Sequence, residues 1–223
     1  MKSFQSVADW SVADWFDWKN HNGNDSVENS HKNALKKLGW RHPDVLYSFL
    51  GIYCLGLETQ SQYKDRFNQL WEQENNARQK RYSRQFLQKC CADSHLREFN
   101  NTHELKDFLS VYYSLGNLIP VWPGGNSARG RAGVYDIPEV FFHQKDVRPW
   151  AERLLEVYPD AALSDVVKTN ILAAEHGSVY AVFDSITNFK TWLGHEDNYF
   201  RYVSHCIQVI QSREKHLKKH LRK

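Results

Sequence analysis

The sequence predicts a mainly α-helical protein in which residues 1–223 form a single multi-helix domain, with at most a small β-hairpin near residues 116–142. Three observations support this prediction. Apolar residues recur at intervals of three and four along most of the chain, which is the spacing of one helix face. No linker-like stretch divides the sequence into two units. Aromatic residues make up 14% of the chain, so a core of large rings can be built.

Residues 1–24 are expected to form an N-terminal aromatic arm. A five-residue sequence is repeated at once near the start of the chain, and the arm carries three tryptophans: Trp10, Trp15 and Trp18. Ser6 or Ser11 is suited to cap a short helix in this region. The rings would then dock the arm onto the rest of the protein, or alternatively bind a partner.

Two helices are expected next. Asp25 and Glu28 have the spacing of a capping box, which predicts a helix that continues to about Leu38 and is ended by Gly39. Pro43 suits the first turn of a second helix, which should be largely buried because it carries an apolar stripe. The stripe comprises Val45, Leu46, Phe49, Leu50 and Tyr53.

Residues 61–99 predict a long helical stretch, in which the polar segment 72–80 is either an exposed bridge or a break. Asn101 and Glu104 form another capping-box pattern, ahead of a helix over residues 105–113. That helix runs directly into a glycine-rich segment.

The second half of the chain is also mostly helical by pattern. The patterns of residues 147–158 and 166–174 predict helices. Those of residues 137–142 and 179–183 fit either a strand or a helix. From Tyr199 onwards a single helix is expected. It is apolar as far as Ile210, and residues 211–223 form its basic end.

The formal net charge of +3 is small for 223 residues, so bulk charge does not require a nucleic-acid partner. Basic residues nevertheless crowd in two places, from Arg78 to Arg97 and from Arg213 to Lys223. Two interpretations stay open for these clusters. They are solvated helix faces, or they contact nucleic acid or an acidic partner.

Cysteine usage and hydropathy exclude several classes of protein. The four cysteines lack a Cys-x-x-Cys spacing, so reduced, buried thiols are expected. No basic segment followed by an apolar run opens the chain, and no run of about eighteen apolar residues occurs in it. The sequence therefore predicts a cytoplasmic protein with no membrane partner, no cofactor and no metal site. A divalent metal is expected only if the protein is a metal-dependent nuclease.

Residues 112–131 are the most distinctive segment, with four glycines and two prolines. Backbone amides beside glycines can hold an anion, and Asn126, Arg129 and Arg131 would complete a phosphate or carboxylate site. The segment is neither a Walker loop nor a Gly-x-Gly-x-x-Gly dinucleotide loop. A structural loop, with Trp122 in the core and Arg129 paired with an acidic side chain, accounts for the same residues.

Part of this loop resembles a nuclease segment. Tyr113-Ser-Leu-Gly-Asn-Leu-Ile-Pro-Val, followed by Asn126-Ser, is similar to a segment of the HNH-type nuclease domain of GmrSD-like restriction enzymes. The resemblance implies a ββα-metal fold, in which Asn117 is structural and Asn126 lies near the metal-facing helix. That family activates water beside a divalent metal with a histidine on an upstream strand. The nearest upstream histidines here, His95 and His103, lie in sequence that predicts a helix or a cap.

A longer stretch, about residues 112–189, is similar to a bacterial family that carries no established activity. The shared pattern is Leu-Gly-Asn-Leu-Ile-Pro, then Gly-x-Asn-x-Ala-Arg-Gly, then an aromatic-rich helical region. This resemblance implies only that Asn126, Arg129 and Gly130 belong to a recurring loop.

Arg201 and His205 would share one face of the C-terminal helix and can both point into a cleft. The pair resembles the Arg-x4-6-His signature of helical HEPN-type ribonucleases, with a shorter spacing of three residues. The resemblance implies RNA cleavage that survives a chelator. A surface or core-edge pair is the alternative interpretation.

Three hypotheses for function remain. The first is a bacterial or phage protein that binds nucleic acid or a protein partner through the 116–131 loop and through basic helices, which carry Arg78, Arg81, Arg84 and the C-terminal lysines. The second is a degenerate nuclease, either HNH-like with a divalent metal or HEPN-like, of the kind found in defence systems. The third is a structural or inhibitory protein that docks through its N-terminal tryptophans. The oligomeric state stays open.

Overall fold

The computed structural model describes residues 11–22, 27–40, 43–74, 82–120, 186–195 and 197–222. In these ranges nine α-helices, two short 3₁₀ helices and one two-stranded antiparallel sheet are present, which confirms the mainly helical class. In chain order the elements are α1 (Val12–Asn22), α2 (Val27–Lys37), β1 (Pro43–Val45), α3 (Phe49–Thr59), α4 (Ser61–Gln73), α5 (Arg84–Ala92), η2 (Ser94–Leu96), α6 (Arg97–Asn100), α7 (His103–Tyr112), η3 (Leu115–Asn117), β2 (Leu118–Pro120), α12 (Ile186–Leu193) and α13 (Asn198–Leu221).

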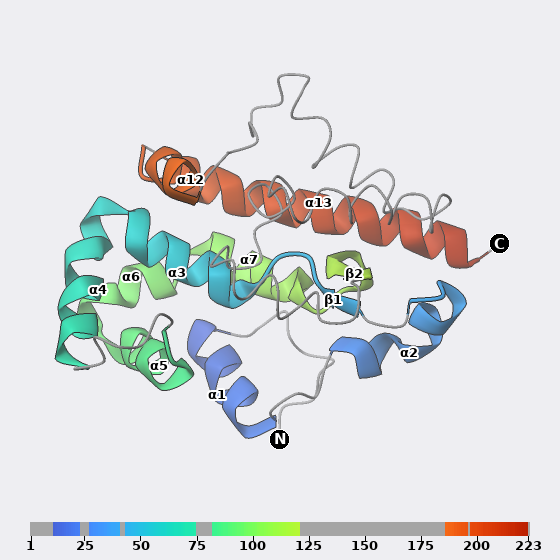
Figure 1. Ribbon diagram of the computed structural model, residues 1–223, viewed down its shortest axis with the longest axis horizontal. Helices are drawn as coiled ribbons and strands as arrows, with labels where there is room; N and C mark the ends of the chain where they lie inside the picture. The colour runs from blue at the N-terminus through green and yellow to red at the C-terminus, as the bar shows by residue number, and fades with distance from the viewer. Residues whose placement is uncertain are drawn as a thin grey trace.

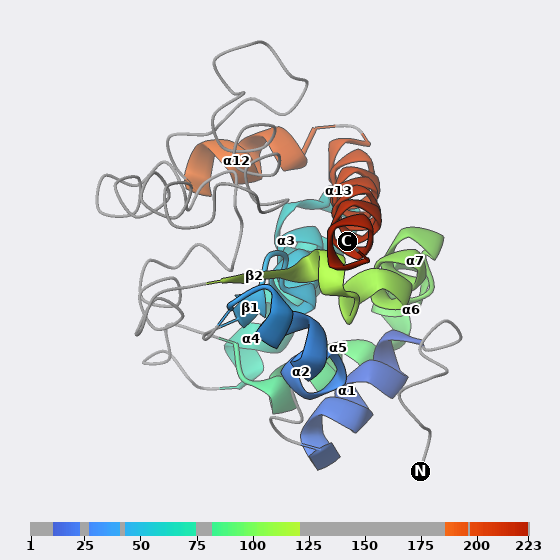
Figure 2. The ribbon, with the colours of Figure 1, turned by 90° about the vertical axis from the view of Figure 1, so that its right-hand side faces the viewer.

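The longest of the described elements is α13, which has 24 residues and runs along one side of them (Figure 1). It packs against η3 and α7, and more lightly against α3 and α12. Figure 2 views α13 end-on and shows it above α7 and β2. The single helix expected from Tyr199 onwards is therefore confirmed. None of the described helices combines the length and apolarity needed to cross a bilayer.

The described part of the N-terminal arm, residues 11–22, contacts the core. Ser11 and Asp14 form a reciprocal cap, in which the Asp14 amide donates to Ser11 Oγ and the Ser11 amide donates to the Asp14 carboxylate. Trp15 is 3% exposed, and its ring lies 4.8 Å from that of Phe49 and 5.8 Å from that of Tyr112, centroid to centroid. Helix α1 is therefore part of the main core. Trp10 and the Trp18 side chain lie outside the described part of the chain.

Helix α2 ends where the sequence indicates. Gly39 has a φ of 71°, a left-handed conformation that glycine adopts without a steric penalty. The Gly39 amide donates to the Lys36 oxygen and the Trp40 amide to the Leu35 oxygen, which is a Schellman motif. A hydrogen bond between His31 Nε2 and the Tyr113 oxygen, 2.8 Å long, ties α2 to the end of α7.

The expected helix at Pro43 is wrong. Pro43–Val45 forms β1, which pairs antiparallel with β2 so that Asp44 lies opposite Ile119. Helix α3 begins later, at Phe49, because Ser48 accepts a hydrogen bond from the Gly51 amide and is the better N-cap. One small antiparallel sheet is present as expected, but it is not a hairpin within residues 116–142, because the partner of β2 is β1, far upstream. Residues 121–142 are outside the described ranges.

The stretch 61–99 is not one long helix. Helix α4 ends at Gln73, and α5 starts after Ser83, whose Oγ accepts from the Phe86 amide. Asp93 ends α5 and caps η2 by accepting from the His95 amide. It also accepts two hydrogen bonds from Arg66, and that contact lowers the Asp93 pKa. Because Asp93 interacts with the end of α5 and with the start of η2, one helix ends and the next begins at this residue.

The capping box at residue 101 is also wrong. Thr102 is the N-cap residue of α7, and its side chain makes no capping hydrogen bond. The Asn101 side chain instead closes the end of α6, because its Nδ2 donates to the main-chain oxygen of Arg97, 2.8 Å away. Short polar side chains stabilise either kind of helix end, so the sequence pattern alone does not distinguish them.

Burial accounts for the cysteines as expected. Cys54, Cys90 and Cys206 are buried and Cys91 is half-buried, all as free thiols. Burial raises the pKa of Cys91 to about 12, and raises that of Cys90 further. Thiols of this kind stay protonated at neutral pH and pack as small apolar groups.

Several expected elements lie outside the described ranges. They are the helices at 147–158 and 166–174, the ambiguous segments at 137–142 and 179–183, and the loop from residue 121 to 131.

Candidate functional site

Helix α13 has two distinct faces. Its buried face consists of Tyr199, Tyr202, Val203, Cys206, Ile210, Arg213 and Leu217. The opposite face carries polar residues at alternating intervals of four and three, which keeps them aligned along the helix. We call this face the polar stripe: Arg201, His205, Gln208, Ser212, Lys215, Lys219 and Arg222. All of its members are exposed except the half-buried His205.

A buried arginine anchors the stripe-bearing helix. Arg213 is 4% exposed, and its guanidinium donates to the Gly116 oxygen and, over 2.8 Å, to the Leu118 oxygen. The neighbouring Glu214 accepts a 2.6 Å hydrogen bond from the Gly116 amide. Burial lowers the Arg213 pKa to about 10, so the side chain stays charged at neutral pH. Arg213 therefore does not belong to the exposed basic cluster in which the sequence placed it.

Close contact with η3 explains the Leu-Gly-Asn-Leu segment. A Cβ at Gly116 would lie 2.0 Å from the Ile210 oxygen, so only glycine lets α13 approach this closely. Asn117 is 0% exposed. Its Oδ1 accepts from the Tyr47 amide, and its Nδ2 donates to the oxygens of Tyr47 and Tyr112. These contacts occupy the polar atoms of the Asn117 side chain with backbone groups.

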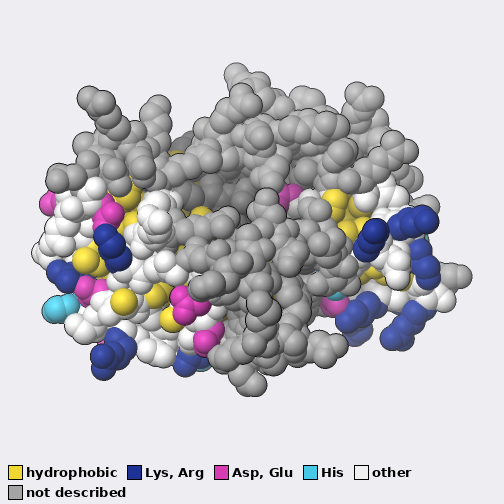
Figure 3. All heavy atoms as spheres, turned by 90° about the horizontal axis from the view of Figure 1, so that it is seen from below, with side chains coloured by type: hydrophobic (Ala, Val, Ile, Leu, Met, Phe, Trp, Pro, Cys, Tyr) yellow, Lys and Arg dark blue, Asp and Glu magenta, His cyan; other side chains and the backbone are white. Residues whose placement is uncertain are grey.

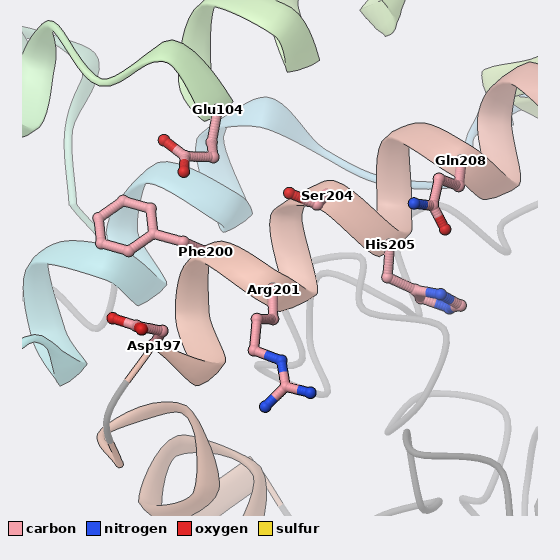
Figure 4. Close-up of a pocket in the computed structure, with 7 residues that line it drawn as sticks. All are labelled: Glu104, Asp197, Phe200, Arg201, Ser204, His205 and Gln208. Carbon is pink, nitrogen blue, oxygen red and sulfur yellow. The ribbon is translucent and has the colours of Figure 1, made fainter.

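A groove lies beside the N-terminal half of α13. It has a volume of about 510 Å³ and is lined by Glu104, Asp197, Phe200, Arg201, Ser204, His205 and Gln208. Glu104 comes from α7, and the other six come from α13 or from its N-cap residue Asp197. In Figure 4, Arg201 and His205 leave α13 on the same side, away from Glu104. The groove is therefore lined by both acidic and basic residues.

The groove combines groups of different chemistry. Burial lowers the pKa of His205, so its imidazole is neutral at pH 7 and can accept a proton. Arg201 is exposed, and the Phe200 ring is half-buried. The Glu104 carboxylate lies 3.3 Å from Nδ1 of His103, which is itself 82% exposed. The groove offers a proton acceptor, a cation, an aromatic surface and two carboxylates.

A second surface lies at the other end of the polar stripe. Three exposed lysines of α2 lie at the same end of the molecule as the last turns of α13 (Figure 1). Figure 3 shows Lys and Arg side chains gathered at this end. We call it the basic surface: Lys32, Lys36, Lys37, Lys215, Lys218, Lys219 and Arg222. Lys218 lies 2.6 Å from the Glu214 carboxylate, so part of its charge is compensated.

The predicted site residues are only partly brought together. Arg201 and His205 line the same groove, as their spacing predicts. The described residues of the HNH-like hypothesis are not brought together. His95 is 71% exposed beside Asp93, whereas Asn117 lies in the core. Among the described residues no group of three or more His, Cys, Asp or Glu could hold a metal. Asn126, Arg129, Arg131, Arg78, Arg81 and the Arg84 side chain lie outside the described part.

Sequence reasoning missed most of the groove and half of the basic surface. Ser204 and Gln208 follow Asp197 at helical spacing, so a search for a polar face on the last helix would have found them, whereas the apolar Phe200 carried no such signal. Glu104 was interpreted only as a capping residue, and its approach to α13 depends on the tertiary fold. The sequence shows that α2 is rich in lysine, but it does not show that these lysines lie at the same end of the molecule as the last turns of α13.

Trp15 is accounted for by packing within the chain. Because its ring is buried against Phe49 and Tyr112, it is not exposed for docking to another protein. The hypothesis that the protein docks to a partner through its N-terminal tryptophans therefore loses Trp15 as an anchor.

Comparison of the chain with protein-family models, curated protein sequences and solved structures finds no match. The fold and the groove must therefore be interpreted from their own geometry.

Proposed function

We propose that this protein binds nucleic acid, and that the basic surface on α2 and α13 makes the main contacts. The single observation that carries this proposal is the gathering of seven Lys and Arg residues from two helices on one end of the molecule. Glu214 is the one acidic residue in the described stretch 211–222, and stretch 31–40 contains none. A surface of this kind neutralises phosphates and releases their counterions.

The composition of this surface favours a phosphate backbone over an acidic protein. The exposed residues of 31–40 and 211–222 are all polar or glycine. Protein interfaces derive most of their binding energy from aromatic and apolar anchors, together with arginine. A phosphate backbone needs only repeated positive charge. Contacts of this type are largely independent of base sequence and are weakened by salt.

The fold supports the proposal by holding the two helices together. His31 fixes α2 to the Tyr113 backbone, and Arg213 with Glu214 fixes α13 to Gly116, three residues further on. Both halves of the basic surface are therefore anchored to the same short segment. The charges are pre-organised, which reduces the entropy lost on binding.

The test is a titration of a fluorescein-labelled 20-nucleotide oligonucleotide, followed by fluorescence anisotropy at several salt concentrations. The variant Lys36→Glu/Lys219→Glu changes one residue on each helix of the basic surface. We expect it to bind at least tenfold more weakly at about 100 mM salt, with a shallower dependence of log Kd on log salt.

The matched control is Lys64→Glu/Arg97→Glu, which makes the same change in net charge on exposed residues of α4 and α6. These helices lie at the opposite end of the molecule in Figure 1. The control should bind like the wild type. Equal weakening by both variants, or binding that does not respond to salt, would contradict the proposal.

A second candidate function is favoured by the groove, where Arg201 and His205 occur together. In a HEPN-like ribonuclease, a neutral His205 would take the proton from a ribose 2′-hydroxyl. The 2′-oxygen would then bond to phosphorus as the bond to the 5′-oxygen breaks, and that oxygen would take a proton from water. Arg201 would stabilise the charge on the phosphate.

This candidate predicts cleavage of end-labelled RNA in the presence of EDTA, and no cleavage of DNA of the same sequence. His205→Ala and Arg201→Ala should each abolish cleavage, whereas Ser212→Ala, further along the stripe, should not. Cleavage that is lost with chelator would favour an HNH-like reaction. Cleavage that is equal in all variants would indicate a contaminating nuclease.

A further inference from the structure

We infer that the groove receives one unpaired base of the bound nucleic acid, so that the protein prefers single strands to duplexes. This inference rests on the proposed function and specifies its ligand. The groove and the basic surface lie along the same helix, and the polar stripe connects them. From Arg201 to Arg222 the stripe covers about 30 Å at the rise of an α-helix, enough for several nucleotides.

The charges of the groove indicate that the group that enters it is not a phosphate. Glu104 and Asp197 line the groove together with Arg201, so an anion held there would face two carboxylates. Carboxylates instead accept hydrogen bonds from neutral donors, such as the exocyclic amines of bases or a ribose hydroxyl. The phosphates are better placed on the side of Arg201 and along the stripe towards Lys215 and Lys219.

The remaining lining matches a base. The half-buried ring of Phe200 offers an aromatic surface on which any base can stack. Ser204 and Gln208 add a hydroxyl and an amide, which can pair with the edge of a base. A volume of about 510 Å³ lies within the usual range of small-molecule sites, roughly 300–1,000 Å³.

Access to the base produces the preference for single strands. In a duplex the bases are stacked and paired, and one must be unstacked before it can enter a protein pocket. In a single strand that penalty is small. A duplex would therefore contact the basic surface alone, whereas a single strand would use both the basic surface and the groove.

The experiment compares a labelled single strand with the duplex of the same sequence, using the full-length protein. Phe200→Leu keeps an apolar side chain but removes the flat ring. We expect wild type to bind the single strand about tenfold more tightly than the duplex. We expect Phe200→Leu to weaken single-strand binding about tenfold and to change duplex binding less than twofold.

Duplex binding also serves as the folding control. If Phe200→Leu binds neither ligand, the substitution Gln208→Ala at an exposed position is the second test. It should weaken binding of the single strand and leave binding of the duplex unchanged. Equal affinity of the wild type for both ligands, or equal loss of both ligands by Gln208→Ala, would overturn the inference and leave the proposed function intact. Failure of wild type to bind either ligand would overturn the proposed function and the inference together.

Discussion

The guanidinium of Arg213 donates a hydrogen bond to the main-chain oxygen of Gly116, 97 residues earlier in the chain. This contact joins the helix that carries the groove and the polar stripe to the segment that precedes β2. Because the contact is buried, it sets the position of α13 on the core. The groove depends on that position, since Glu104 reaches it from α7.

Arg213→Met should destabilise the protein even though methionine fills a similar volume. The substitution leaves the oxygens of Gly116 and Leu118 without their donor, and each unsatisfied buried group costs about 1–3 kcal/mol. We expect a loss of about 2–4 kcal/mol in the free energy of unfolding, measured by urea denaturation. Lys219→Met, on the exposed face of the same helix, should change it by less than about 0.5 kcal/mol. Equal effects would show that the anchor contributes nothing.

Gly116→Ala should also loosen α13. The added Cβ would meet the Ile210 oxygen and the Glu214 amide at 2.0 and 2.7 Å, and both are backbone atoms of the helix. Overpacking of this kind typically costs about 1–3 kcal/mol. Gly194→Ala, where the nearest atom lies 3.2 Å away, is the milder comparison. Thermal unfolding of both variants would reveal the order, and a more stable Gly116→Ala would contradict the close approach.

Asn117→Ala should act on stability. The Asn117 side chain makes hydrogen bonds to Tyr47 N, Tyr47 O and Tyr112 O, and none of these groups is on the surface. We expect a loss of about 2–4 kcal/mol in the free energy of unfolding. Asn101→Ala, at an exposed helix end, should lose less than about 1 kcal/mol. A stable Asn117→Ala that lacked only an activity would favour the HNH-like role instead.

His205 predicts a pH dependence of stability with a definite sign. Burial lowers its pKa in the folded state below the ordinary value of about 6.5, so on acidification the unfolded chain takes up a proton first. The stability due to neutral His205 is complete above pH 6.5 and declines as the pH falls below it.

The check is a comparison of wild type with His205→Gln in urea at pH 7.5 and pH 5.5. Acidification should cost the wild type up to about 1 kcal/mol more than the variant. Glu104, Asp197 and Arg201 line the same groove and remain in both proteins, so the difference isolates the imidazole. Parallel behaviour of the two proteins would mean that His205 is solvated like an ordinary histidine.

Trp15→Ala should destabilise the whole molecule. The ring packs edge-on against Phe16, Phe49 and Tyr112, and its removal leaves a large cavity. Truncation of a buried aromatic residue costs about 3–5 kcal/mol. Trp15→Phe should lose much less, because the indole Nε1 is buried without a hydrogen-bond partner. If Trp15→Ala unfolded like the wild type, a role in partner binding would regain support.

Local signals predicted the parts of this fold that depend on local physics. Gly39 ends α2 because glycine adopts a positive φ, and Ser11 caps α1 because its hydroxyl accepts an amide proton from the first turn. The apolar pattern predicted the single helix from Tyr199 onwards, and the spacing of Arg201 and His205 placed them on one side. Each of these inferences involves residues that are near neighbours in the chain.

Inferences failed where a distant segment changed the local preference. Pro43 suits a helix start, but β2 offers Pro43–Val45 a partner strand and Ser48 provides a stronger cap. Arg213 belongs by sequence to a basic cluster, yet the carbonyls of Gly116 and Leu118 hold it in the core. Neither outcome has a signal within a short window of sequence.

The sequence by itself determined the helical class, the aromatic core, the reduced thiols and the single helix from Tyr199 onwards. These properties follow from side-chain size, spacing and capping chemistry, which act over a few residues. Only the tertiary structure decided that Glu104 joins Arg201 and His205 in a groove, and that the lysines of α2 and α13 share one end of the molecule. Those arrangements depend on contacts between residues far apart in the chain, such as Arg213 with Gly116 and His31 with Tyr113.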